Sequence, residues 1–199
     1  MRTTIINILF LFLSLNAFCQ IPTFEHNFES NDSIENPLLK STLENYDVII
    51  SYTEQNYWWS DRKYYQILAF KDNEWSNWYY SDFRIKKTTN SDGTITQDTI
   101  REGKLYKGKK KLKNSNVSKL LSLFEQTSFW ELEREEINKT VNIDDGTNYR
   151  FEIFTRKKAR VAESYMPDFY IAKNPEDINI RKFIENRDFF LKWWKKYCH

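Results

Sequence analysis

Apolar and polar residues alternate through the middle of the chain, and this period of two predicts β-strands. Residues 48–53, 64–70 and 75–83 all follow it, and the polar residues 71–74 join the last two segments into a hairpin. A second hairpin is expected at 90–93, where an Asp-Gly pair supplies the positive φ of a tight turn. Together these segments predict an antiparallel meander of four or five strands.

Helical spacing of apolar residues replaces this alternation further along the chain. Residues 117–126 place apolar side chains on one face of an amphipathic helix, and Phe129 and Trp130 are expected to hold the chain against the core. Asn36-Pro37 has the cap and first-turn proline of a helix start. Residues 174–177 repeat that pattern and predict a final helix that runs close to the C-terminus.

Two more strands are expected between these helices. One begins after Asp144-Asp145-Gly146 and places Tyr149, Phe151 and Ile153 on one face, and a turn at 157–159 leads to a returning strand. The sequence therefore predicts a single α+β domain over residues 36–199, with an antiparallel meander sheet packed by two or three helices.

The first nineteen residues have a different pattern, which indicates export. A positively charged start precedes an apolar run from Ile5 to Leu15, and together residues 1–19 are typical of a secretory signal peptide. Residues 20–35 are polar and irregular, as in a flexible arm. We expect cleavage after Cys19 and a periplasmic or secreted protein, with lipidation of Cys19 as an outer-membrane lipoprotein the alternative. The apolar run is too short to span a bilayer, and no later run is longer, so no integral membrane segment is expected after cleavage.

Charge and cysteine content narrow the range of partners. The formal net charge is 30 − 28 = +2, and a nearly neutral protein has no overall field that would attract nucleic acid, so we expect no nucleic-acid partner. Cleavage after Cys19 leaves Cys198, which then has no cysteine to pair with inside the chain. Cys198 is expected to be an idle thiol near a frayed terminus or to form an intermolecular bridge.

The usual catalytic and metal-binding patterns are missing from the sequence. The two histidines are His26, in the expected arm, and His199, whereas a catalytic histidine must be held rigidly beside its partner. The sequence has no metal-ligand spacing and no glycine-rich phosphate loop, so no cofactor and no metal are expected. Acidic residues near Glu131 and at Asp144 and Asp145 are read as a charged connector and a turn, or as a carboxylate pair for glycoside cleavage.

Aromatic residues gather between residues 46 and 80 and provide the candidate binding site. Within strand 75–83, Trp75 and Tyr79 share one face, whereas Trp78 and Tyr80 share the other. These aromatics either fill a core on both faces or present a flat platform on which a sugar or peptide stacks. The candidate ligand-binding residues are Tyr57, Trp58, Trp59, Trp75, Trp78 and Tyr80.

The last part of the chain is similar to a family of exported proteins. Val117, the Phe129-Trp130-x-Leu132 segment and the Asp145-Gly146-Thr147-x-Tyr149-x-x-Glu152 stretch resemble a loose pattern in uncharacterised exported proteins of Bacteroidota-type bacteria. These motifs consist mainly of packing and turn residues. The resemblance implies export but implies no activity, and it transfers no functional residue.

These patterns favour an exported, non-catalytic domain that binds a glycan, peptide or protein through its aromatic sheet region. One alternative is a structural or inhibitor-like module that acts through a sheet edge or the C-terminal helix, where Trp193 and Trp194 would belong to an apolar patch. A carboxylate-based hydrolase is the other alternative. The lysine-rich residues 104–113 are read as a loop or charged edge strand, or as a contact for an acidic partner.

Overall fold

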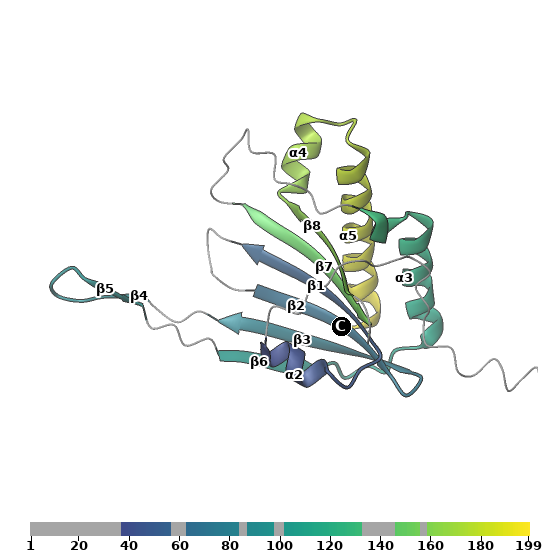
Figure 1. The fold of residues 1–199 in the computed structure, drawn as a ribbon, viewed down its shortest axis with the longest axis horizontal. Helices are drawn as coiled ribbons and strands as arrows, with labels where there is room; N and C mark the ends of the chain where they lie inside the picture. The colour runs from purple at the N-terminus through teal and green to yellow at the C-terminus, as the bar shows by residue number, and fades with distance from the viewer. Residues whose placement is uncertain (1–36, 57–62, 84–86, 98–101, 133–145, 156–158) are drawn as a thin grey trace, which may run out of the picture.

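The computed structural model describes residues 37–56, 63–83, 87–97, 102–132, 146–155 and 159–199 (Figure 1). The expected signal peptide at 1–19 and the expected arm at 20–35 lie outside these residues.

An open six-stranded antiparallel sheet forms the centre of the domain, in the order β6-β3-β2-β1-β7-β8. Its strands are β1 (Val48–Asn56), β2 (Lys63–Lys71), β3 (Glu74–Phe83), β6 (Glu102–Lys107), β7 (Thr147–Thr155) and β8 (Ala159–Tyr165). The first four make a continuous meander, and the β7–β8 hairpin pairs with the other side of β1. The predicted single α+β domain with an antiparallel meander sheet is thus confirmed.

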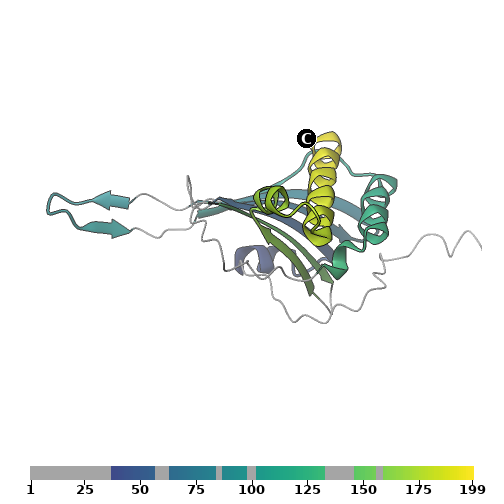
Figure 2. The ribbon, with the colours of Figure 1, turned by 90° about the horizontal axis from the view of Figure 1, so that it is seen from above.

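Helices lie on both faces of the sheet (Figure 2). They are α2 (Pro37–Leu43), α3 (Asn114–Gln126), α4 (Pro167–Lys173) and α5 (Ile178–Tyr197), with a short 3-10 turn η1 (Phe129–Glu131) after α3. Figures 1 and 2 show α3, α4 and α5 on one face and α2 on the other. Both faces are therefore covered in part, so aromatic side chains on either face of a strand can be buried.

The turns of the meander follow local backbone chemistry. Asp72 and Asn73 both have positive φ, of 51° and 63°, as a two-residue type I′ hairpin between β2 and β3 requires. Gly93 also has a positive φ, of 81°, in the expected second turn. That turn joins β4 (Lys87–Thr89) to β5 (Ile95–Gln97) in a separate two-stranded sheet, so the second hairpin does not extend the main meander as expected.

The larger core lies between the sheet and the layer of α3, α5 and η1. Phe124, Phe129, Phe151 and Phe190 are fully buried in it, and their rings pack edge-to-face or stacked. Such ring pairs add about 0.5–1.5 kcal/mol each beyond the area they bury. The expected clamp at Phe129 and Trp130 is confirmed, because both side chains are buried in this core.

A second, smaller core lies on the other face, beneath α2. Leu43 is 1% exposed there and packs with Ile49, Ile67 and the ring of Tyr80. The odd-numbered residues of β1 and β2 point to this face, and the even-numbered residues point to the larger core.

The final helix begins later than the sequence pattern predicted. Asn174 follows the end of α4, a helix that the sequence analysis did not predict, and α5 starts only at Ile178. The physical reason is the cap, because the Asp177 carboxylate accepts a 3.0 Å hydrogen bond from the Ile180 backbone N–H. Asn174-Pro175 therefore marks the link between two helices instead of a helix start.

Candidate functional site

One face of the sheet consists of rows of side chains, because directly opposed residues on neighbouring strands point to the same face. Two inner rows on the α3/α5 face are mainly apolar. They run across β1, β2 and β3 as Val48, Phe70 and Trp75, and then as Ile50, Leu68 and Asn77. These rows belong to the buried part of the sheet beneath the helices.

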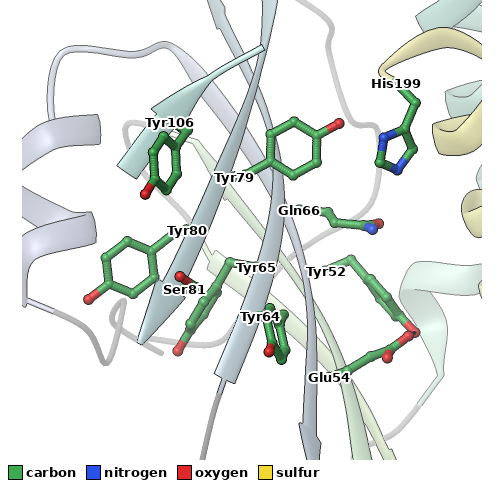
Figure 3. A pocket seen from close by; sticks show the side chains of 10 residues that line it. All are labelled: Tyr52, Glu54, Tyr64, Tyr65, Gln66, Tyr79, Tyr80, Ser81, Tyr106 and His199. Atoms are coloured by element: carbon green, nitrogen blue, oxygen red, sulfur yellow. Dashed lines mark hydrogen bonds between the residues drawn. The ribbon is translucent and has the colours of Figure 1, made fainter. Parts of the chain in front are cut away.

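The two outer rows of that face carry tyrosines and polar side chains instead. From β1 to β6 they run as Tyr52, Gln66, Tyr79 and Tyr106, and then as Glu54, Tyr64, Ser81 and Lys104. All of these except Lys104 line an open groove of about 410 Å³, which His199 also lines (Figure 3). This volume lies in the range of about 300–1,000 Å³ typical of ligand sites.

A buried tyrosine positions the carboxylate of the groove. The Tyr52 phenol donates a 2.6 Å hydrogen bond to Oε1 of Glu54. Burial raises the pKa of Tyr52 above its ordinary value, and the negative charge of Glu54 raises it further. Tyr52 therefore stays protonated and fixes the orientation of Glu54 at the groove.

The end of α5 contributes to the groove through a second tyrosine. The Tyr79 phenol donates a 3.0 Å hydrogen bond to the Cys198 carbonyl, and its ring lies 5.9 Å from the His199 ring. Burial raises the pKa of Tyr79, so this phenol also remains a donor. The last turn of α5 is thereby held against β3, and His199 is placed beside the groove.

Two further tyrosines present exposed rings at the groove. Tyr64 on β2 and Tyr106 on β6 are each 49% exposed, although both stand on strands of the rigid sheet. The Lys104 ammonium lies 5.8 Å from the centroid of the Tyr106 ring, at the outer limit of a cation–π contact. Exposed aromatic rings fixed on a scaffold are characteristic of recognition surfaces.

Gln66 lies between Tyr52 and Tyr79 in its row, and its amide has an unmet hydrogen-bonding capacity (Figure 3). Its Oε1 is buried and has no hydrogen-bond partner. Leaving a buried acceptor unsatisfied costs about 1–3 kcal/mol. A donor group on a ligand could satisfy this acceptor once the amide turns toward the groove.

The outer row extends past Glu54 to the junction of α4 and α5. Tyr149 on β7 lies opposite Glu54, and the Arg187 guanidinium stands 4.8 Å above the Tyr149 ring. Arg187 donates to both carboxylate oxygens of Asp168, at 2.5 and 2.9 Å, which joins α5 to α4. This pair holds the pKa of the Asp168 carboxyl below its usual range.

The structure distributes the sequence-predicted site residues over two faces. Trp75 is 5% exposed and packs on Phe70 in the larger core, with ring centroids 5.0 Å apart. Tyr80 is 3% exposed, and although it borders the groove, its ring packs against Tyr65 on the α2 face. Trp78 is half-buried on that same face.

Trp75 therefore lies on the opposite face from Trp78 and Tyr80, and the alternation predicted for β3 is correct. The three residues cannot form one binding surface. Trp78 contacts Tyr46 edge-to-face at 6.4 Å, and the Lys107 ammonium lies 5.4 Å from its ring. The remaining predicted residues, Tyr57, Trp58 and Trp59, lie outside the described residues.

Sequence reasoning missed the residues that form the groove, namely Glu54, Tyr64, Gln66, Tyr79 and Tyr106. The signal that could have identified them is the alternation along β1, β2, β3 and β6, since these residues share the face of Val48, Phe70 and Trp75. The missing information was the strand register, which decides which residues of different strands lie side by side.

Apart from His199, the reactive or charged residues singled out from the sequence that belong to the described part of the chain do not line the groove. His26, Asp144 and Asp145 lie outside the described residues, and no group of metal-ligating side chains occurs within the described ranges. Cys198 is 4% exposed, which contradicts its expected place near a frayed terminus, because the end of α5 is packed on the sheet. Lys104 and Lys107 belong to β6, the edge strand that the basic stretch had suggested.

The protein is a single-domain α+β protein with an open antiparallel sheet, and the outer rows of the α3/α5 face of this sheet form an aromatic, partly exposed groove. Comparisons with protein-family models, with curated proteins and with solved structures found no match for this chain. Among the described helices, none combines the length and apolar character needed to cross a bilayer.

Proposed function

We propose that this protein is an exported, non-catalytic binding domain whose ligand site is the tyrosine-lined groove. The observation that carries the proposal is the pair of half-exposed rings, Tyr64 and Tyr106, fixed on strands of one sheet face. At 49% exposure, each ring forgoes about half of the ~1.5–3 kcal/mol that full burial of a large apolar side chain contributes. A ligand that covers the rings would recover part of this stabilisation.

Rigidity supports a binding role. β1, β2 and β3 are each paired on both sides, and all the groove residues except His199 stand on these strands and on β6. Tyr79 is tied to α5, and Glu54 is tied to Tyr52. A preorganised site loses little side-chain entropy when it binds, so these contacts favour affinity.

Binding is favoured over catalysis by the nature of the lining. Aromatic rings and neutral polar groups dominate it, and Glu54 is the only side-chain carboxylate among its described lining residues. The Tyr52 phenol keeps this carboxylate engaged as a hydrogen-bond acceptor. The alternative function at the C-terminal helix has less support, because Trp193 and Trp194 are buried at 4% and 1% exposure.

Export is the second part of the proposal and rests on residues 1–19. The test is expression of the full chain in a Gram-negative host, followed by fractionation and intact-mass measurement. Loss of residues 1–19 from a periplasmic or secreted protein supports the proposal, and an added lipid mass on Cys19 supports the lipoprotein alternative. Full-length protein in the cytoplasm would contradict export.

The groove is tested by screening immobilised oligosaccharides and peptides with wild-type protein, Tyr64→Ala and Tyr106→Ala. Phe189→Ala is the matched control, because Phe189 is a 36% exposed aromatic on α5 that does not line the groove. We expect a ligand whose affinity falls at least about tenfold in both tyrosine variants and is unchanged in the control. Equal binding by all four proteins, or no binding of any probe, would refute the groove as the site.

A further inference from the structure

We infer that the ligand of the groove is a neutral oligosaccharide, whose sugar rings stack on Tyr64 and Tyr106 and whose hydroxyls bond to Gln66 and Glu54. This inference rests on the proposed function and specifies its ligand. It follows from the lining chemistry, the local charge and the position of the groove on the sheet.

The lining chemistry matches the two kinds of surface that a sugar offers. Pyranose rings present apolar C–H faces, which pack on aromatic rings, and a rim of hydroxyls, which both donate and accept hydrogen bonds. Within two adjacent rows the groove alternates these partners, since Tyr64 lies opposite Glu54 on β1 and Ser81 on β3. Gln66 likewise lies opposite Tyr79, which in turn lies opposite Tyr106.

The unsatisfied amide of Gln66 indicates that the ligand supplies a donor. Gln66 is partly exposed and lines the groove, whereas its Oε1 is buried and unpartnered. The terminal torsion of a glutamine is broad, so rotation of the amide can bring Oε1 to the groove while Nε2 turns inward. A sugar hydroxyl would then satisfy this acceptor, and the Glu54 carboxylate can accept bonds beyond the one from Tyr52.

The charges around the groove favour a neutral ligand over a charged one. Glu54 lies in the floor, Lys104 ends the same row of side chains, and His199 borders the groove. A polyanion would meet the Glu54 carboxylate, and a polycation would meet the Lys104 ammonium. A neutral polyhydroxyl chain meets neither penalty.

The position of the groove favours a sugar over an extended peptide. Peptides that bind sheets usually add a strand at an edge and use main-chain hydrogen bonds. The groove lies instead on a face, mainly across β1, β2 and β3, whose backbone groups already pair with neighbouring strands on both sides, and it includes the edge strand β6 only through the Tyr106 side chain. Recognition there depends on side chains alone, as in stacking on aromatic rings.

The test is titration calorimetry of the purified mature protein with hexasaccharides of β-1,4-glucose, β-1,3-glucose, β-1,4-mannose, β-1,4-xylose and α-1,4-glucose. Oligogalacturonate and one acidic and one basic hexapeptide are the charged probes. We expect at least one neutral sugar to bind and both charged classes to bind at least about tenfold more weakly, a difference of about 1.4 kcal/mol.

Variants locate the bound sugar. Tyr64→Ala, Tyr106→Ala and Gln66→Ala are each expected to weaken the neutral sugar at least about tenfold, and Glu54→Gln several-fold. Phe189→Ala should leave its affinity unchanged, and circular dichroism checks that every variant is folded. Released reducing ends are measured in parallel, and none is expected.

The outcomes separate the inference from the proposed function. If only a charged probe binds and the tyrosine variants lose it, the sugar inference is wrong, while the groove remains a binding site. If a neutral sugar binds equally well to the wild type and to all groove variants, both fail. Cleavage of a sugar that Glu54→Gln abolishes would retain the sugar as ligand but contradict the non-catalytic role.

Discussion

The Tyr79 phenol donates a 3.0 Å hydrogen bond to the Cys198 carbonyl, which joins the groove floor to the end of α5 across 119 positions of sequence. The last carbonyls of a helix lack partners within the helix. Here Tyr79 and the Asn77 amide, at 3.3 Å, both donate to the same oxygen. The side chains of β3 thus act as a C-terminal cap for α5, and one of them is also a groove residue.

Replacing Tyr79 with phenylalanine is expected to destabilise the fold. The ring can still pack on Trp194, with centroids 5.3 Å apart in the wild type, but the bond to Cys198 is lost. We expect a loss of about 1 kcal/mol in the free energy of unfolding, measured by urea denaturation. Tyr106→Phe, at a half-exposed ring, is the control and should change stability by less than about 0.5 kcal/mol. Equal stability of the two variants would contradict the capping role.

Local patterns in the sequence predicted which residues are buried, but they did not predict the groove. Alternation predicted the opposite faces of Trp75 and Trp78 correctly, and helical spacing predicted α3, because these patterns reflect burial of nearby residues. The groove depends instead on which residue of β1 lies beside which residue of β2 and β3. The two-residue turn at Asp72-Asn73 fixes the register of β2 with β3, whereas the register of β1 with β2 is a tertiary property that no local pattern determined.

The helix boundaries show a second limit. Asn174-Pro175 predicted one helix start, and the cap at Asp177, three residues later, determines where α5 begins. Cys198 shows a third limit, since a residue near the chain end is expected to fray unless something holds it. Its carbonyl accepts hydrogen bonds from Asn77 and Tyr79, which are about 120 residues away, and its side chain lies in the larger core.

Cys198 is expected to be unreactive in the native protein. Burial raises the pKa of its thiol to about 12, so very little thiolate is present at neutral pH. In a Cys19→Ser variant, reaction with dithionitrobenzoate at about pH 8 should be at least about tenfold slower in the native protein than in concentrated guanidinium chloride. Rapid native labelling, or a disulfide-linked dimer formed without unfolding, would contradict this burial.

The Asp168–Arg187 pair is expected to make stability depend on acid pH. Because Arg187 lowers the native pKa of Asp168, the ionised pair stabilises the fold above the unfolded value of about 3.9 and is lost as pH falls through the native value. The Asp168 side chain is 59% exposed, so Asp168→Asn should cost only about 0.5–1 kcal/mol at neutral pH.

Urea denaturation across the acid range tests this linkage. The stability difference between wild type and Asp168→Asn should shrink toward zero as pH falls below the unfolded pKa. Glu185→Gln, which changes an exposed carboxylate on α5, the helix that carries Arg187, is the control and should alter stability little. A difference that stays constant down to the lowest pH would show that the Asp168 charge does not contribute.

Gly108 is expected to be intolerant of a side chain, because Asn77 packs against it. The Gly108 N–H donates a 2.8 Å bond to the Asn77 carbonyl, and a Cβ at this position would overlap the Asn77 amide. That amide is 1% exposed as part of Asn77 and donates to Cys198, so Gly108→Ala should displace it and weaken the cap of α5. We expect a loss of about 1–3 kcal/mol.

A double-mutant cycle separates this clash from a general effect of removing glycine. Once Asn77→Ala has removed the amide, the added methyl group has room, so Gly108→Ala should cost markedly less in that background. Gly93→Asn is the matched control, because a Cβ at Gly93 meets nothing within 4 Å and asparagine tolerates its φ of 81°. If Gly108→Ala costs the same with and without the Asn77 amide, the loss comes from the backbone of Gly108, and the amide does not couple β3, Gly108 and the end of α5.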